Sequence, residues 1–381
     1  MRLLQPPPEF FWNFEITGVP SDQSTMVVSR PDIHGLFVLN PAARSIWTSL
    51  QRGGTRESII ADLTSQFGIS PSRAAADVEA TLESWSQSLL SPVQETESPA
   101  QPTLPPSIKD SFTCDYAIGE KHFRLLVDDP EFVEEIVPRL AHLNADPKPP
   151  DVTFRVSRHQ NQFQVFSGRS CIGVEPEVGV ARTILLQEMA RLSRPETDWL
   201  AILHAGVCGT STDCVIMPAA TNSGKSTLAA ALMHSGLHLY SDDSAALDRR
   251  TMHVVSLPFA LMLREGSWPT LAPYFPELAS APALERNGDN VRFLAPSLSH
   301  SVQTATPKCL LFPEFSPGAP TEIHSLTPFE TLLGLQKSGF WVPHNRQSIR
   351  TFLSWVQSLP AYQMTYSDLT EAVPAVHGLI Q

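Results

Sequence analysis

Basic residues are scarce in this chain: 27 Lys and Arg stand against 39 Asp and Glu, and the formal net charge is −12. Because nucleic acids are bound through a basic face, no nucleic-acid partner is expected. The five cysteines include no CxxC pair, which argues against a zinc site or a disulfide framework. No stretch approaches the ~20 apolar residues of a membrane span, and the opening MRLLQPPPEF lacks a signal peptide's apolar run. These absences predict a soluble cytoplasmic protein with no membrane partner.

The length of the chain, 381 residues, predicts more than one domain, because single cores rarely grow beyond about 250–300 residues. The stretch SPVQETESPAQPTLPPS is rich in Pro, Ser and Thr and has no periodic apolar pattern, so it is predicted to be a linker. We therefore expect one domain over residues 1–92, a linker over 93–108, and a second domain over 109–381. The second domain divides into parts at 109–195 and 196–381.

Three helical patterns follow a short strand pair in the first domain. The strand pair is predicted over Met26–Ser29 and Gly35–Leu39. Asn40, Thr55 and Ser70 each stand where a helix N-cap is expected, just before a stretch with helical apolar spacing. A strand pair followed by three helices is typical of a winged-helix-like domain.

From Leu39–Ala43 through Ile46-Trp47 to the third helix, this domain resembles the PqqD family of leader-peptide-binding domains. The resemblance implies that a precursor peptide joins the exposed edge of the strands, where backbone pairing supplies affinity and side-chain pockets supply specificity. The alternative is a winged helix that binds DNA. It is disfavoured because the third helix carries Arg73 against three acidic residues.

Two patterns divide the second domain. Short strands around a helix near Pro130–Leu143, followed by a long amphipathic helix over Val180–Leu192, predict an α+β part. From Trp199 onward strands and helices alternate, which is typical of a nucleotide-binding α/β core. The predicted fold class is therefore α/β and α+β.

A phosphate loop is predicted after the short apolar strand Val215–Met217, because the loop ends in Gly224-Lys225-Ser226-Thr227 and leads into a helical run. The backbone N–H groups of such a loop converge on phosphate oxygens, and the helix N-terminus adds its positive dipole. Lys225 would reach the β- and γ-phosphates of ATP, and Ser226 would hold Mg²⁺. The residues assigned to the ATP phosphates are Ala219, Ala220, Thr221, Asn222, Ser223, Gly224, Lys225, Ser226 and Thr227.

Two positions of this loop depart from the usual glycines. Ala219 replaces the first glycine, which matters little if its backbone angle φ is ordinary. Asn222 stands where related kinases have another glycine, and Asn adopts left-handed backbone angles at little cost.

Two adjacent carboxylates, Asp242 and Asp243, follow the apolar strand after Gly236. They repel each other unless a cation or a proton lies between them. Coordination of Mg²⁺ by one, and acceptance of a hydroxyl proton by the other, would use both. The alternative is a capped turn, for which Ser and Asp are suitable residues. His204 closes an apolar strand that is expected to end at the same side of the sheet.

Leu203–Gly206, the phosphate loop and Gly236–Asp243 together resemble the catalytic domain of HPr kinase/phosphorylase. The likeness is closer to the HPr-kinase-related proteins of peptide-modification gene clusters, which Pro360–Leu369 also resembles. It covers about residues 112–381 and implies the fold shared with phosphoenolpyruvate carboxykinase. It also implies a catalytic set of Asp242 as base with His204 and Lys225, a magnesium site of Ser226 and Asp243, and a homo-oligomer.

One signature of the bifunctional enzyme is missing from the sequence. No Glu-x-Arg-Gly-x-Gly stretch is found, so phosphorolysis and HPr itself as a substrate are not expected. The stretch Leu257–Gly266 instead looks like the substrate-side strand of the related kinases. Arg264 and Arg292 are the candidates for holding the substrate or a phosphate.

Together these patterns predict an ATP- and Mg²⁺-dependent kinase. Its substrate would be a Ser or Thr hydroxyl of a ribosomally made precursor peptide that the first domain binds. A kinase for small-molecule hydroxyls is one alternative. Another is a peptide chaperone that binds ATP without transferring phosphate, which the two replaced glycines keep open.

Overall fold

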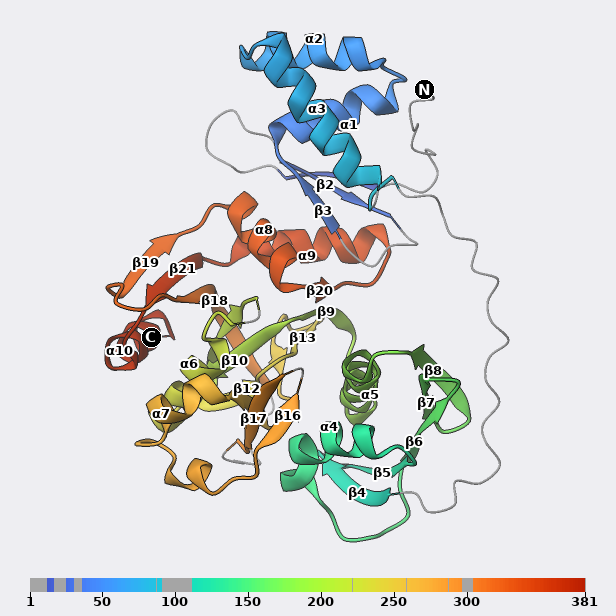
Figure 1. Cartoon of the computed structure of the whole chain (residues 1–381), viewed down its shortest axis with the longest axis vertical. Coiled ribbons are helices and arrows are strands. Elements are labelled where there is room, and N and C mark those ends of the chain that lie inside the picture. Colours follow the sequence, from blue (N-terminus) through green and yellow to red (C-terminus); the bar gives the residue numbers. More distant parts are fainter. Residues whose placement is uncertain are drawn as a thin grey trace.

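The computed structural model (Figure 1) describes residues 12–16, 25–30, 36–86, 88–90, 112–220, 222–257, 259–286, 288–296 and 304–380. The predicted linker, 93–108, and Thr221 of the phosphate loop lie outside these residues. The fold is mixed α and β, as predicted. None of the helices in the described ranges is long and apolar enough to cross a bilayer.

The first domain is a small antiparallel sheet with three helices. The strands β1 (Trp12–Ile16), β2 (Thr25–Ser29) and β3 (Leu36–Leu39) lie in that order, and the helices are α1 (Pro41–Gln51), α2 (Arg56–Phe67) and α3 (Pro71–Ser86). The Asn40 side chain accepts a hydrogen bond from the Ala43 N–H and caps α1, and Thr55 caps α2 in the same way. Trp47 and Trp85 meet edge to face with ring centroids 5.8 Å apart in the core between helices and sheet.

The α+β part, predicted around the helix near residue 130, is a five-stranded sheet with two helices. The strands are β4 (Phe112–Ile118), β5 (Lys121–Val127), β6 (Val152–His159), β7 (Gln162–Ser167) and β8 (Ser170–Glu175). The helices α4 (Pro130–Leu140) and α5 (Val178–Ser193) share a buried core with this sheet. α4 is followed by the short 3-10 helix η1 (Ala141–Leu143).

A ten-stranded mixed sheet forms the centre of the second domain, and eight of its strands lie in the order β12-β10-β11-β18-β14-β13-β9-β20. Its strands are β9 (Trp199–Leu203), β10 (Ala205–Gly209), β11 (Asp213–Pro218), β12 (His238–Ser241), β13 (Ala245–Asp248), β14 (Val254–Val255), β18 (Thr304–Phe315), β19 (Glu322–Ser325), β20 (Phe340–Trp341) and β21 (Ala361–Tyr366). A separate sheet holds β15 (Leu261–Arg264), β17 (Asp289–Leu294) and β16 (Leu284–Arg286), with the short helices η2 (Glu265–Ser267), α7 (Trp268–Leu271) and η3 (Pro276–Ala279) beside it in sequence.

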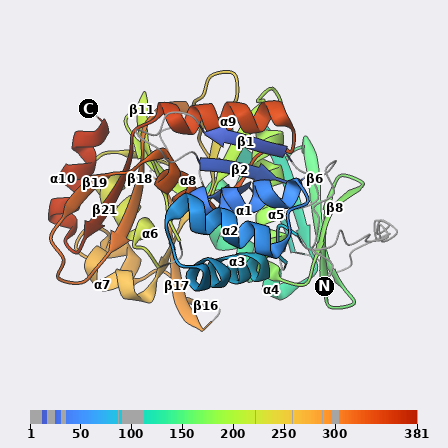
Figure 2. The same cartoon turned by 90° about the horizontal axis from the view of Figure 1, so that it is seen from above.

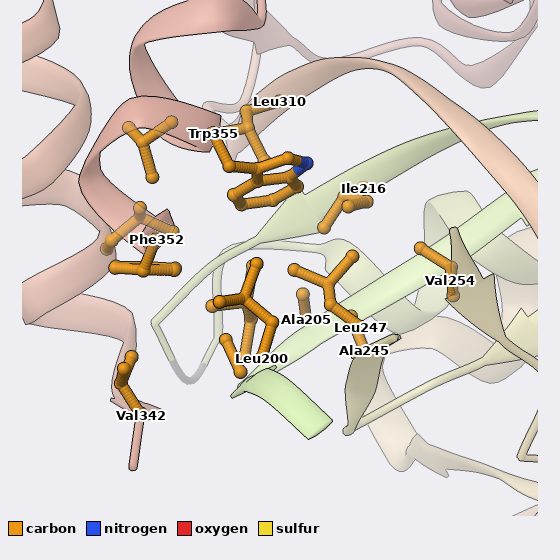
Figure 3. Packing of buried hydrophobic residues seen from close by; sticks show 14 of the residues in the cluster. Leu200, Ala205, Ile216, Ala245, Leu247, Val254, Leu310, Val342, Phe352 and Trp355 are labelled. Atoms are coloured by element: carbon orange, nitrogen blue, oxygen red, sulfur yellow. The ribbon is translucent and has the colours of Figure 1, made fainter. Parts of the chain in front are cut away.

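Helices cover both faces of the central sheet. On one face α6 (Lys225–His234) and α10 (Leu369–Ile380) contribute to one apolar core. On the other face α8 (Pro328–Ser338) and α9 (Arg346–Ser358) contribute to a second core. Figure 3 shows Phe352 and Trp355 of α9 pointing at Leu200 and Ile216 of the sheet.

Strands β2 and β3 of the first domain contribute buried side chains to the cores on both faces of their sheet. Met26 and Val28 of β2 face its own helices, whereas Val27 between them belongs to the same buried cluster as Leu335 of α8 and Phe352 of α9. This alternation follows from the two-residue period of a strand. In Figure 1 β2 and β3 lie directly above α8 and α9, and in Figure 2 β1 lies beside α9. The two domains therefore share an apolar core.

Deleting residues 1–95 is expected to lower the melting temperature of the remaining chain, because α8 and α9 would lose the cover that Val27 and Leu36 provide. Each such side chain contributes about 1.5–3 kcal/mol when it is fully buried. Thermal unfolding of the intact and shortened chains measures the effect. As the control, a chain cut within 96–108 but retaining both parts should melt close to the intact protein. An unchanged melting temperature after the deletion would show that the shared core contributes little.

Candidate functional site

Three sequence-predicted elements meet at one edge of the central sheet. Strand β10 is antiparallel to both of its neighbours, with Ala205 opposite Pro218 of β11 and Val207 opposite Ser241 of β12. The residue before β10 is His204, the phosphate loop follows β11, and the two carboxylates follow β12. The strand register therefore brings these three segments together, although they are separate in the sequence.

Two of the described residues of the phosphate loop have left-handed backbone angles. Asn222 has a φ of 69° and Gly224 a φ of 86°, whereas Ala219 is not in the left-handed region. A Cβ atom at Gly224 would lie 2.3 Å from Tyr366 Oη, so only glycine fits there. Tyr366 Oη donates a hydrogen bond of 3.0 Å to the Gly224 carbonyl and anchors the loop. Ala219 and Asn222, which stand in place of the two usual glycines, are thus compatible with a phosphate-loop backbone.

The start of α6 has features that suit an anion. Gly224 is the N-cap residue, and no side chain among the described residues caps the first turn. The Ser223 hydroxyl is buried and has no hydrogen-bond partner in the described part of the chain. N–H groups of an uncapped first turn, together with the helix dipole, form a suitable site for phosphate oxygens.

Each carboxylate contacts one residue of α6. Ser226 Oγ donates to Asp242 Oδ1 at 2.9 Å, and Asp242 Oδ2 accepts from the Met262 N–H at 3.2 Å. Lys225 Nζ lies 3.1 Å from Asp243 Oδ1. Asp242 is 4% exposed, whereas the side chain of Asp243 is 34% exposed and therefore accessible to a substrate.

The surroundings shift the two carboxyl groups in opposite directions. Burial, together with the charge of Asp243, raises the pKa of Asp242 to about 6. Burial alone would also raise the pKa of Asp243, but the positive charges of Lys225 and Arg139 outweigh it and lower that pKa. Below about pH 6 the pair therefore holds one proton, which lies on Asp242, while Asp243 stays negatively charged.

His204 and Gly206 complete this edge of the sheet. Burial and the charge of Lys225 lower the pKa of His204, so the imidazole is neutral near pH 7. A Cβ atom at Gly206 would lie 3.3 Å from Lys225 Cγ, so a glycine on β10 gives the lysine side chain room to pass.

The two predicted substrate arginines lie on the small β15–β17 sheet and have partners of their own there. Arg264 forms an ion pair with Asp289. The guanidinium group of Arg292 lies 3.9 Å above the ring of Trp268. Neither contact involves the phosphate loop or the carboxylate pair.

A cluster of arginines next to the carboxylates was not predicted from the sequence. Arg139 Nη1 lies 3.5 Å from Asp243 Oδ2. Arg182 and Arg286 both pair with Glu135. These residues come from α4, α5 and β16, so no short motif contains them. Arg139 and Arg182 fall on predicted helices and Arg286 on no predicted element, so the sequence gives no signal that joins the three.

Two side-chain oxygens at the start of α6, from Ser226 and Asp242, could contribute to a magnesium site. Within the part of the chain that the structure describes, no group of three or more His, Cys, Asp or Glu side chains could hold a metal ion. Magnesium is commonly bound by one or two protein oxygens plus substrate phosphates. Ser226 Oγ beside Asp242 is a pair of that kind.

The first domain matches a known protein family. Residues 25–89 match the family model of the coenzyme PQQ synthesis protein D, PqqD. These residues form a PqqD-like domain. Strand β1 precedes the matched residues and extends the sheet of the PqqD-like domain, with Trp12 opposite Ser29 and Ile16 opposite Thr25. No curated protein is significantly similar to the chain.

The PqqD-like domain connects the chain with the modification of ribosomally made peptides. Domains of this kind bind precursor peptides, which is consistent with the predicted peptide partner. The matched residues end before the α+β part begins. The match therefore gives no information on the chemistry of residues 112–380.

Proposed function

We propose that the chain is an ATP-dependent kinase that phosphorylates a Ser or Thr hydroxyl of a precursor peptide held by its PqqD-like domain. The observation that carries the proposal is the arrangement at the sheet edge, where Lys225 and Ser226 at the start of an uncapped helix contact the paired carboxylates. Such an arrangement of lysine, hydroxyl and carboxylate suits a magnesium-bound nucleotide.

In this proposal the N–H groups of the loop and Lys225 hold the phosphates of ATP. Ser226 and one carboxylate would hold Mg²⁺, which would offset the negative charge that develops during transfer. The Lys225 ammonium group would then contact the phosphates instead of Asp243, since it cannot interact strongly with both. That change would remove a positive charge from Asp243 and raise its pKa, making it a better proton acceptor.

The division of roles between the carboxylates stays a prediction. The sequence resemblance implies that Asp242 accepts the hydroxyl proton and that Asp243 binds magnesium. The contacts support the opposite division better, because Asp242 is buried and accepts from Ser226, whereas the side chain of Asp243 is 34% exposed. The raised pKa of Asp242 is compatible with this, since bound Mg²⁺ would displace the proton.

Paired substitutions distinguish the two divisions. Asp242→Asn is expected to weaken Mg²⁺-dependent ATP binding, whereas Asp243→Asn should spare binding and lower turnover by roughly 10²–10⁴-fold, the usual contribution of a general base. Binding is measured by calorimetry with and without Mg²⁺, and turnover by product formation. In the unmodified protein, Mg·ATP binding should weaken as the pH falls below about 6, where Asp242 takes up a proton. The reverse pattern for the two variants would restore the sequence-based division.

Two other functions lose support. A chaperone that binds ATP without transfer was kept open by the two replaced glycines, but Asn222 has a left-handed backbone angle that Asn adopts at little cost. A small-molecule kinase would have no use for a PqqD-like domain.

The full chain incubated with ATP, Mg²⁺ and the short peptides encoded beside its gene tests the proposal directly. We expect one of these peptides to gain the mass of a phosphoryl group. ATP that binds tightly but is never transferred to peptide or small hydroxyl compounds would overturn the kinase proposal.

A further inference from the structure

Three arginines from three different elements meet beside Asp243. Arg139 lies in the last turn of α4, Arg182 on α5 and Arg286 at the end of β16. Glu135, one turn before Arg139 on α4, accepts from Arg182 and, at 2.9 Å, from Arg286 Nη2. The exposed fractions of the three arginine side chains are 3%, 13% and 19%, so the cluster is largely buried.

These guanidinium groups have more donors than their neighbours can satisfy well. Arg139 Nη2 and Arg286 Nη1 both point at the sulfur of Met262, at 3.3 and 2.7 Å, and a thioether is a weak acceptor. Arg139 Nε is buried with no partner among the described residues. Poorly satisfied buried donors destabilise a fold unless a ligand supplies the acceptors.

The local charge is positive although the chain as a whole is acidic. Three arginines and Lys225 surround the two carboxylates of Glu135 and Asp243. Burial, with the charges of Arg139 and Arg286, lowers the pKa of Arg182 to about 10. Carboxylates and phosphates are the groups that guanidinium donors bind most strongly.

The position of the arginine cluster suits binding of the phosphate acceptor rather than of ATP. Lys225 contacts Asp243 Oδ1, whereas Arg139 contacts Oδ2 of the same carboxylate. Asp243 therefore stands between the phosphate loop and the cluster. A molecule bound to the arginines would present its neighbouring atoms to Asp243 from the side opposite the loop.

We infer that Arg139, Arg182 and Arg286 form a subsite for an oxyanion that the phosphate acceptor carries close to its hydroxyl group. The inference rests on the proposed kinase function and narrows its substrate class. The acceptor is a hydroxyl with a carboxylate or phosphate nearby, such as a Ser or Thr flanked by an acidic group.

The test measures binding of malonate and inorganic phosphate to the full chain by calorimetry at constant ionic strength. Arg286→Gln is expected to weaken binding of both anions at least tenfold. Glu135→Gln removes the acceptor that competes with the ligand, so it should tighten binding several-fold. The control is Arg191→Gln, an exposed α5 arginine paired with Glu188, which should leave both affinities unchanged.

A purely structural cluster would respond differently. In that case Arg286→Gln and Glu135→Gln would both lower the melting temperature, and added phosphate would restore neither. If Glu135→Gln does not fold, Arg182→Gln is used in its place. If the subsite exists, phosphate should raise the melting temperature of the unmodified chain more than that of Arg182→Gln. Absence of anion binding by the unmodified chain overturns the inference.

Separate outcomes identify which idea fails. Loss of ATP affinity in Arg286→Gln would assign the cluster to the nucleotide and overturn the acceptor subsite. Equal transfer to peptides with and without an acidic neighbour of the hydroxyl would also overturn it and leave the kinase proposal intact. Anion binding at the arginines without transfer to any acceptor would instead remove the kinase proposal.

Discussion

Lys225→Ala is expected to abolish detectable phosphoryl transfer and to weaken ATP binding strongly. The ammonium group is buried at the start of α6, 3.1 Å from Asp243, where it would face the β- and γ-phosphates. It would offset phosphate charge in the ground state and in the transition state. Removal of a single donor to developing negative charge costs about 10²–10³-fold in turnover, and loss of a full positive charge should cost at least that.

A matched lysine provides the control for this variant. Lys121 of β5 also pairs with an aspartate, Asp151, at 3.3 Å, but it lies in the α+β part away from the carboxylate pair. Lys121→Ala should therefore keep normal ATP binding and turnover. Thermal unfolding of both variants separates a loss of chemistry from a loss of fold. Unchanged turnover in Lys225→Ala would remove the kinase proposal.

Local signals in the sequence predicted the elements that hold the site. The N-caps of the first domain and the strand–loop–helix pattern depend on residues within one or two turns of each other, such as Asn40 with Ala43. The left-handed angle of Asn222 was likewise foreseeable from its residue type. Such features are determined by short-range sterics and hydrogen bonding, so the sequence is sufficient to predict them.

Features that depend on tertiary packing were not predicted. The arginine cluster joins Arg139, Arg182 and Arg286, which only the packing of α4, α5 and β16 brings together. Ser226 contacts Asp242 rather than Asp243, and this depends on the direction in which each side chain points after the end of β12. The shared core of the two domains left one trace in the sequence: Met26-Val27-Val28 is apolar on both faces, which is typical of a strand buried on both sides.

Because of that shared core, deletion of the PqqD-like domain is an ambiguous test of its peptide-binding role. Deletion of the PqqD-like domain would also uncover α8 and α9, so a loss of activity after deletion would have two explanations. The peptide can be shortened instead, while the chain stays intact. A shortened peptide leaves every contact within the protein unchanged.

A precursor peptide without its leader is therefore expected to have a KM about 10²–10⁴-fold higher than the full precursor, with a similar kcat. The leader would anchor the peptide on the PqqD-like domain, so the acceptor segment would reach the catalytic site at a high effective concentration rather than from bulk solution. Once the site is saturated, the tether has no further effect, which is why kcat should be preserved. Free leader added to the full precursor should inhibit competitively, and free leader added to the leaderless peptide should not restore its KM, because the covalent link supplies the advantage. Equal KM values for the two peptides would mean that the PqqD-like domain does not deliver the acceptor, and a small-molecule kinase would become the better explanation of the site.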